Sequence, residues 1–375
     1  MAELHNETRA LEHWLFEHAL PLWWEVGADR VGGGYHEAIE LNGRPFAKPH
    51  RARSIARMVF AFCEAGRLGW NGPWREAAAH ALAYLDKHFI CADATVASVV
   101  GLDGSPANAP FDLYEQAFAL LAFACGHAAF GGALGCRRQA TALHASLARS
   151  LAHPLGGFRE DADGRLPQRA NPHMHLLEAA LAWMAVDDDA GWRAMADDLA
   201  TLCLERFIDA QSGGLRELFA ADWSPANGVP GRICEPGHCY EWAFLLDRWA
   251  RATMRPRPQA VTGLIAFADT HGLDRRRGVA INAVLLHEGN VHDPMARLWA
   301  QAERVRAYVC EGRSEADLVQ AIQGLRRFLA TPVPGLWFDQ LGPDDRPVPE
   351  PARATSLYHI IGAATELAKP ELAKA

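Results

Sequence analysis

Apolar positions along the chain fall into long helical runs, and alternating strand-like patterns are absent. The segment 54–62 is rich in alanine, apolar on more than one face and free of proline and glycine. The segments 114–129, 175–185 and 241–252 have the same apolar character, and connectors bearing glycine or proline separate them. A helix that is apolar nearly all round is a buried helix. We therefore expect these segments to form an inner wall.

Two features repeat along the chain at intervals of roughly 60 residues, which is the length of two helices and two loops. Glycine-centred turns begin at positions 33, 101, 156, 213, 278 and 335. Polar residues interrupt the apolar helices in the same rhythm, at Arg57, Glu115, Glu178, Glu241, Glu303 and His359. Six such units account for the chain. The pattern predicts an all-α (α/α)6 barrel, a six-hairpin toroid forming one catalytic domain over 1–375, with a central pocket floored by long loops at one end.

Composition narrows the class of protein. The 375 residues are 50% hydrophobic, and the net charge of -8 disfavours a nucleic-acid partner. No apolar run approaches the roughly 20 residues that cross a bilayer, and the N-terminus lacks a signal-peptide pattern. Eight scattered cysteines without a CxxC pair favour free thiols. We expect a cytoplasmic protein without a membrane or nucleic-acid partner, either a monomer or a homodimer.

Two helix starts carry a histidine followed three residues later by a glutamate, which places both on one helix face. In the first, Asn171 is the expected N-cap and the pair is His175 with Glu178. In the second, the pair is His238 with Glu241. A carboxylate beside an imidazole orients the ring and raises its basicity. Two copies in consecutive repeats favour a functional role over two structural histidines.

Two further polar residues interrupt apolar helices. His359 opens the last apolar helix, and Arg57 is the charged residue within the apolar run from Ile55 to Phe62. A buried arginine needs an anionic or strongly polar partner. That partner is either a glutamate on a neighbouring inner helix or a substrate oxygen whose developing negative charge the arginine stabilises.

Histidines titrate near neutrality and suit proton transfer. The chain has no nucleophile elbow, P-loop or dinucleotide fingerprint. His173 and His175 resemble a metal-ligand pair, but residues two apart on a helix point about 200° away from each other. HExxH is also absent, so we expect no metal and no cofactor.

At these segments the chain resembles the N-acylglucosamine 2-epimerase superfamily, along essentially its whole length. The resemblance is carried by residues 55–58, 112–118, 171–179, 235–246 and 358–359. It implies cofactor-independent chemistry at C1 and C2 of a reducing sugar. It also implies a catalytic group made of Arg57, His175, His238, Glu241 and His359. Expected contacts with the monosaccharide come from Asn171, Tyr114, Glu178, Arg232 and Trp337, the last as one of the flat aromatic walls on which sugar rings stack.

The run from Glu235 to Trp242, followed by Leu245 and Leu246, looks most like the mannose isomerase branch of that superfamily. We therefore expect an aldose–ketose isomerase that interconverts D-mannose, or an analogue such as lyxose, with D-fructose. One histidine would assist ring opening, and His238 or His359 would remove the C2 proton to give a cis-enediolate. A 2-epimerase of a reducing sugar is the first alternative. A glycoside hydrolase, which needs two flanking carboxylates, and a non-catalytic sugar-binding module remain as others.

Overall fold

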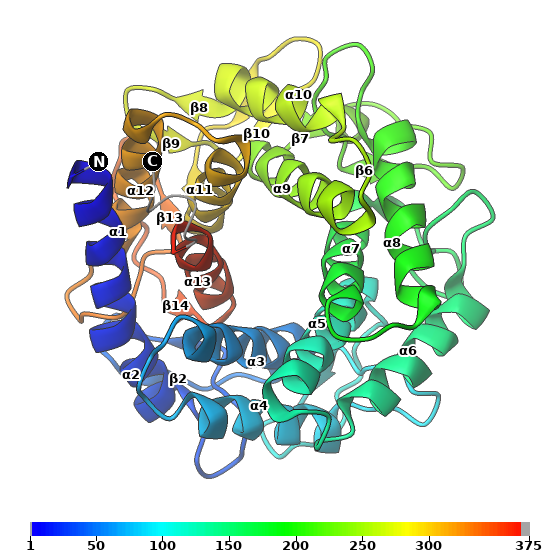
Figure 1. Ribbon diagram of the computed structural model, residues 1–375, viewed down its shortest axis with the longest axis vertical. Coiled ribbons are helices and arrows are strands. Elements are labelled where there is room, and N and C mark those ends of the chain that lie inside the picture. The colour runs from blue at the N-terminus through cyan, green and yellow to red at the C-terminus, as the bar shows by residue number, and fades with distance from the viewer. Residues whose placement is uncertain (1, 369–375) are drawn as a thin grey trace.

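The computed structural model describes residues 2–368, and within them six helices line the axis of a ring (Figure 1). These inner helices are the apolar segments of the sequence, and their side chains are buried nearly all round. Each begins where the repeat predicts an inner helix. They are α3 (Ala52–Arg67), α5 (Leu113–Phe130), α7 (Ala170–Met184), α9 (Pro236–Thr253), α11 (Leu298–Glu311) and α13 (Thr355–Leu367).

An outer ring of helices covers the inner one (Figure 1). The outer helices are α1 (Ala2–Trp14), α4 (Trp74–His88), α6 (Cys136–Leu151), α8 (Ala190–Leu202), α10 (Gln259–Phe267) and α12 (Glu315–Arg326), and α1 continues through the short α2 (Leu20–Leu22). Each inner helix packs on its outer neighbour, while α13 packs on α3 and α1 on α12. The first and last repeats therefore meet, and the predicted (α/α)6 barrel is confirmed.

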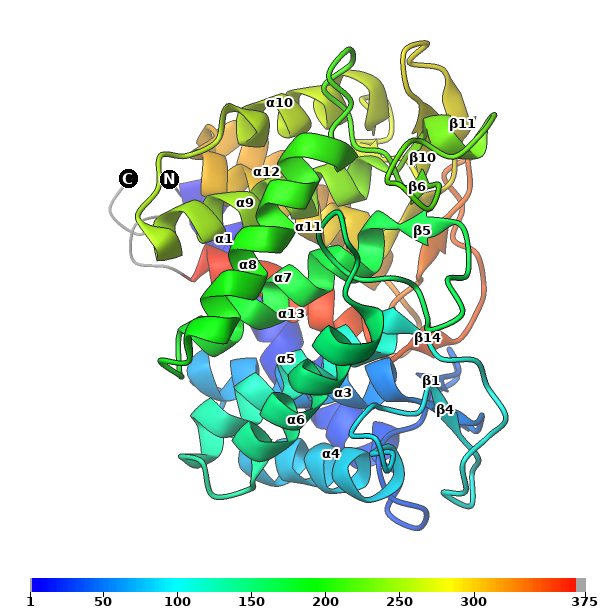
Figure 2. The ribbon, with the colours of Figure 1, turned by 90° about the vertical axis from the view of Figure 1, so that its right-hand side faces the viewer.

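The loops that precede the inner helices lie together at one end of the barrel (Figure 2) and contain short antiparallel strands. The sequence pattern does not show them, because two or three residues are too few for an alternation. They are β1 (Ala38–Ile39), β2 (Pro45–Phe46), β3 (His50–Arg51), β4 (Val99–Val100), β5 (Gln168–Arg169), β6 (Leu218–Phe219), β7 (Ile233–Cys234), β8 (Leu273–Asp274), β9 (Val279–Ala280), β10 (Ala283–Leu285), β11 (Val291–Asp293), β12 (Ala296–Arg297), β13 (Gln340–Leu341) and β14 (Ala352–Arg353).

Most strand pairs join one repeat to the next. β3 pairs with β4, β5 with β6, β7 with β10 and β12 with β13. β14 pairs with β1, with Arg353 opposite Ala38, so this ladder also runs from the last repeat to the first. The strands fix the loops against one another directly above the starts of the inner helices.

The starts of the inner helices show how local sequence sets their bounds. Asp112 is the N-cap of α5 and accepts a hydrogen bond from the Tyr114 amide (3.1 Å). The N-cap of α7 is Arg169, so the expectation that Asn171 caps this helix is wrong. Asn171 is inside the first turn, and its amide is free to face the barrel axis.

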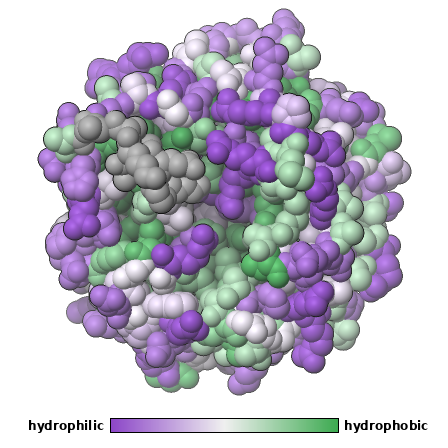
Figure 3. Space-filling view, in the orientation of Figure 1, coloured by the Kyte–Doolittle hydropathy of each residue, from purple (hydrophilic) through white to green (hydrophobic). Residues whose placement is uncertain are grey.

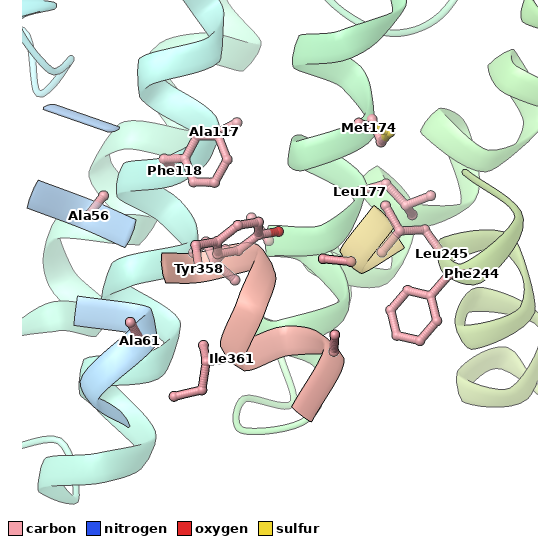
Figure 4. Packing of buried hydrophobic residues seen from close by; sticks show 14 of the residues in the cluster. Ala56, Ala61, Ala117, Phe118, Met174, Leu177, Phe244, Leu245, Tyr358 and Ile361 are labelled. Atoms are coloured by element: carbon pink, nitrogen blue, oxygen red, sulfur yellow. The ribbon is translucent and has the colours of Figure 1, made fainter. Parts of the chain in front are cut away.

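The core lies where the inner helices pack on one another and on the outer ring. Figure 4 shows part of it, with Leu177 of α7 and Leu245 of α9 in the region where these helices meet. Both are fully buried. Trp337 belongs to the core as well: it is 0% exposed and stacks on Trp23 with 5.0 Å between ring centroids. The expected sugar contact of Trp337 is therefore wrong, because its faces are covered by protein.

Two expectations from composition can also be compared with the structure. All eight cysteines are free thiols, as predicted. Among residues 2–368, no helix is both long enough and apolar enough to span a membrane.

Candidate active site

The buried polar side chains gather in the first turns of the inner helices, below the strand-bearing loops. Six helices contribute at the same depth, since each inner helix starts at the same end of the ring (Figure 2). Arg57, His175, His238 and His359 are all at most 6% exposed. The sequence rhythm therefore placed these residues, hundreds of positions apart, around one axis.

His238 is held by a carboxylate from a neighbouring loop. Its Nδ1–H donates to Oε2 of Glu217 at 2.9 Å. Burial alone would lower the pKa of His238, but the charges of Glu217 and Glu235 overcome it and raise this pKa to about 10. His238 is therefore an imidazolium at neutral pH. The expected pairing of His238 with Glu241 is wrong, because the ring turns away from its own helix toward the loop.

Glu217 occupies a position that recurs in other repeats. Glu37 accepts from the amide of Arg51 (2.8 Å) and from Ser54 Oγ (2.7 Å). Glu217 accepts from the amide of Glu235 (3.1 Å) and from His238 in the same way.

Sequence reasoning did not find Glu217, but the repeat carries a signal for it. A carboxylate follows the first turn glycine by four positions at Gly33 and Glu37, Gly156 and Glu160, Gly213 and Glu217, and Gly335 and Asp339. In the first repeat the side chain three residues after the amide that the carboxylate binds is Ser54, whereas in the fourth repeat it is His238. A structural carboxylate thereby becomes the partner of an ionisable ring.

His359 has the opposite electrostatic setting. Its Nδ1–H donates to Oε1 of Glu303 at 2.7 Å, and Arg306 Nη1 binds the same carboxylate at 3.0 and 2.8 Å. Burial and then the charges of Arg57, His175 and Arg306 lower the pKa of His359 well below its usual range. With Nδ1 protonated, the neutral ring keeps a lone pair on Nε2.

His175 pairs with Glu178 as the spacing predicted, with Nδ1 at 3.2 Å from Oε2. Burial lowers the pKa of His175 to about 4, against the raising effect of Glu178. Glu178 also accepts from the Tyr358 hydroxyl and lies 3.5 Å from Arg306. These partners outweigh its burial and lower its pKa to about 2. Glu178 thus lies beneath His175 as a fixed negative charge.

Glu241 lies between the two neutral histidines. Its Oε1 is 3.9 Å from His175 Nδ1 and has no hydrogen-bond partner among the described residues. Burial, together with the negative charges of Glu303 and Glu178, raises its pKa well above the usual range. This shift favours the neutral carboxylic acid form of Glu241, and Arg306 balances its carboxylate neighbours Glu178 and Glu303.

Arg57 faces the same space from α3. Its Nη2 donates to the Tyr114 hydroxyl at 2.7 Å and its Nη1 to the Thr355 carbonyl at 3.2 Å. The guanidinium also lies 4.1 Å from the centre of the Phe118 ring. Among residues 2–368 it forms no ion pair, so the alternative expectation of a glutamate partner on an inner helix is wrong. A buried cation with neutral partners is suited to an anionic or strongly polar ligand atom.

Trp299, which the sequence reasoning missed, separates two of the histidines. Its half-buried ring has its centroid 4.8 Å from that of His238 and 5.8 Å from that of His359. A flat ring between an imidazolium and a neutral imidazole forms one wall of the space they share. Its position in the first turn of an inner helix could have identified Trp299 as a site residue, although the apolar pattern alone suggests a core residue.

The remaining expected residues fall into two groups. Asn171 belongs to the cluster, with Nδ2 at 3.2 Å from His238 Nε2. Its Oδ1 has no partner among the described residues. Because an imidazolium carries a proton on Nε2, that oxygen is the atom able to accept it once the amide turns over. Arg232 is instead a half-buried side chain in an ion pair with Glu288.

His173 is structural, in agreement with the prediction that it faces away from His175. Its Nδ1–H donates to the Arg169 carbonyl at 2.9 Å, and its Nε2 accepts from the Phe158 amide at 3.0 Å. From the equivalent position of α5, Gln116 bonds both the amide and the carbonyl of Val96 at 2.7 Å. Gln301 of α11 does so with Ala280. One side chain near the start of each of these helices therefore holds the loop that precedes it.

Two triads have the composition of a metal site: His175 with Glu178 and Glu241, and Glu241 with Glu303 and His359, with donor atoms within 4.8 Å. Their surroundings fit a cation poorly. Arg306 lies 2.8 Å from Glu303 and 3.5 Å from Glu178, so a guanidinium already occupies the place of the positive charge. A divalent ion would face that charge at close range.

Comparison with known proteins places the chain in a family. The family model of N-acylglucosamine 2-epimerase (GlcNAc 2-epimerase) matches residues 33–363. A mannose-6-phosphate isomerase of Rhizobium meliloti is 41% identical over 97% of each chain. A cellobiose 2-epimerase of Bacteroides fragilis is 25% identical over 87% of this chain and 88% of its own.

The fold agrees with these relatives. The crystal structure of a D-mannose isomerase superposes with a TM-score of 0.85 and 19% identity, covering 96% of this chain and 97% of that one. The family match spans five inner helices in full, most of α13 and the whole histidine cluster. The chain therefore belongs to the N-acylglucosamine 2-epimerase family and is an enzyme of the sugar isomerase and 2-epimerase type.

Proposed function

We propose that this enzyme interconverts an aldose and its 2-ketose, with the mannose and fructose skeletons as the pair. The observation that carries the proposal is the opposite charge preference of two histidines on either side of Trp299. His238 is charged and His359 neutral at the same pH. An isomerisation needs one group that donates a proton to oxygen and one that removes a proton from carbon, and this cluster offers both.

In the proposed mechanism, His359 Nε2 removes the proton from C2 of the open-chain aldose. The electrons of the C2–H bond form the C1–C2 double bond, and those of the C1 carbonyl move to O1. Arg57 stabilises the resulting cis-enediolate, and His238 protonates O1. Loss of the O2 proton to His238 and return of the carbon proton from His359 to C1 give the ketose. His175 and Asn171 are left to position the sugar and assist ring opening.

The names of the relatives differ in whether the sugar carries a phosphate at C6, so an experiment must decide between the two substrates. The relative that is 41% identical is a mannose-6-phosphate isomerase, while a D-mannose isomerase shares the fold. The enzyme should therefore be incubated with mannose and, separately, with mannose 6-phosphate in heavy water, and the products followed by NMR. We expect the corresponding ketose, with deuterium at C1 where the carbon proton exchanges with solvent.

A 2-epimerase is the second candidate, because a cellobiose 2-epimerase is among the relatives. His238 and His359 lie on either side of Trp299, so delivery of a proton from the second ring to the opposite face of C2 would give the epimer. Epimers with deuterium at C2 and no ketose would contradict the isomerase proposal. New reducing ends from an oligosaccharide would point to a hydrolase instead.

A further inference from the structure

A second cavity lies at the end of the barrel opposite to the strand-bearing loops. Its volume is about 470 Å³, and its walls come mainly from the middle and last turns of inner helices, with Leu121 of α5 and Val186 after α7 among them. Small-molecule sites in proteins have volumes of roughly 300–1,000 Å³. Figure 3 looks onto this end, where hydrophobic side chains gather around the axis between hydrophilic ones. The cavity is large enough for a metabolite, and of its lining only Glu178 and Arg306 belong to the site described above.

The carboxylates that line this cavity already have partners. Glu64 accepts from Arg67 at 2.8 Å and from the Thr365 hydroxyl at 3.3 Å. Glu178 is bound to Arg306 and to the Tyr358 hydroxyl, and Glu366 is engaged as well. None of these carboxylates has its charge left for a cationic ligand.

The arginines that line the cavity are not all matched in this way. Arg67 and Arg306 pair with glutamates, whereas Arg248 forms no ion pair within residues 2–368. Its guanidinium is solvent-exposed and 5.5 Å from the Phe244 ring. The Nε of the buried Arg306 also has no hydrogen-bond partner among the described residues. The unmatched charge of the cavity is therefore positive, and it lies beside apolar walls.

We propose that this cavity binds a small organic anion with an apolar body. The anionic group lies against Arg248, and the body lies against the apolar ends of α5 and α7. An arginine with no protein carboxylate to hold it forms charge-assisted hydrogen bonds with a carboxylate or phosphate group. The apolar walls stabilise the rest of the ligand through the area they remove from water.

The floor of the cavity is shared with the histidine cluster. Glu178 lines the cavity and holds His175, and Arg306 lines it and holds Glu303, the partner of His359. An anion held by Arg248 adds a negative charge to the cavity that Arg306 also lines, so it competes with these carboxylates for Arg306 and alters both histidines. Occupancy at one end of the barrel should therefore change turnover at the other, a consequence that rests on the proposed isomerase activity.

The test uses benzoate and phenyl phosphate as probes and benzyl alcohol as the neutral control, titrated calorimetrically into the full chain without sugar. We expect both anions to bind and the alcohol not to bind. Arg248→Gln should weaken binding by about tenfold or more. Ala128→Trp should abolish it by filling the cavity mouth, where Ala128 is exposed. Arg251→Gln, on the same helix but paired with Asp247, is the matched control and should bind like the unmodified chain.

Two results would overturn the site: no binding of either anion, or binding that Arg248→Gln and Ala128→Trp leave intact. Thermal unfolding of each variant shows whether it is folded. Turnover is then measured with and without benzoate, and we expect benzoate to change kcat in the unmodified chain and not in Arg248→Gln. Binding without any change in kcat would overturn the communication between the two ends. Because calorimetry needs no sugar, a wrong substrate assignment does not affect the binding result.

Discussion

The three histidines of the cluster differ in charge because their surroundings differ. His238 has carboxylates on two sides, so its charged form is stabilised. Burial stabilises the neutral forms of His359 and His175, and the charge of Arg57 adds to this effect at both rings. The division of acid and base is thus a matter of which side chains surround each ring.

Replacing Glu217 tests this division at the ring that is charged. Glu217→Gln keeps a hydrogen-bond acceptor for His238 but removes the negative charge, so the pKa of His238 falls from its value of about 10. Since the proposed mechanism requires protonated His238, the loss of kcat/KM with rising pH should begin at a lower pH in the variant. A pH profile of kcat/KM measures this alkaline limb, that is, the decline of activity at high pH.

The matched control for that experiment is Glu37→Gln. Glu37 has the same structural place in the first repeat, but its side-chain partner is Ser54 in place of a histidine. The control should leave the alkaline limb where it is. An equal shift in both variants would mean that the limb does not report on His238.

The proposed base gives a second residue-scale prediction. His359→Ala removes the group assigned to take the C2 proton and should lower kcat by about 10²–10⁴-fold, the usual contribution of a general base. The comparison variant is His173→Gln, because Gln116 and Gln301 hold the equivalent loops in other repeats. Steady-state assays on the same sugar should show near-native turnover for His173→Gln, and near-native turnover for His359→Ala would refute the assignment.

At the scale of single elements, the inner helices are stable because they are buried on nearly every side. Leu177 of α7 is fully buried where this helix meets α9 (Figure 4). The apolar pattern predicted the inner helices well, since all-round burial requires all-round apolar composition. It did not predict the strands, whose pairing depends on which loops the closed ring brings together.

Truncation of one buried side chain measures how tightly the inner ring is packed. Leu177→Ala should lower the free energy of unfolding by about 2–5 kcal/mol, because it leaves a cavity that the neighbouring helices cannot fill. Leu155, which is 50% exposed, supplies the comparison. Leu155→Ala should change the free energy by less than about 0.5 kcal/mol in the same denaturant titration. Similar values for both would show that the ring relaxes around the loss.

Folding of the whole molecule couples these charges to stability, since the loop that carries Glu217 meets His238 only in the folded chain. The pKa of His238 rises from the ordinary value of 6.5 to about 10 on folding. A raised pKa means that the folded state binds the proton more tightly than the unfolded state. The stabilisation is therefore complete below about pH 6.5 and is lost as the pH rises toward about 10.

Denaturant unfolding between pH 6 and pH 10 would measure that loss. The free energy of unfolding should decline over this range in the unmodified chain. In Glu217→Gln the contribution should be smaller at pH 6 and the decline shallower. A slope that Glu217→Gln leaves unchanged would contradict the coupling of His238 to the fold.

The sequence alone determined the repeat, the inner helices and the depth of the polar residues within them, since helical period and burial are local properties of the chain. It therefore predicted the barrel and brought Arg57, His175, His238 and His359 to one axis. Which groups touch was decided only by the tertiary structure. Glu217 meets His238 from the loop that precedes α9, Trp299 meets it from the next inner helix, and Trp337 stacks on Trp23 in the core. A side chain's partners depend on how distant loops and helices pack, which no local pattern contains.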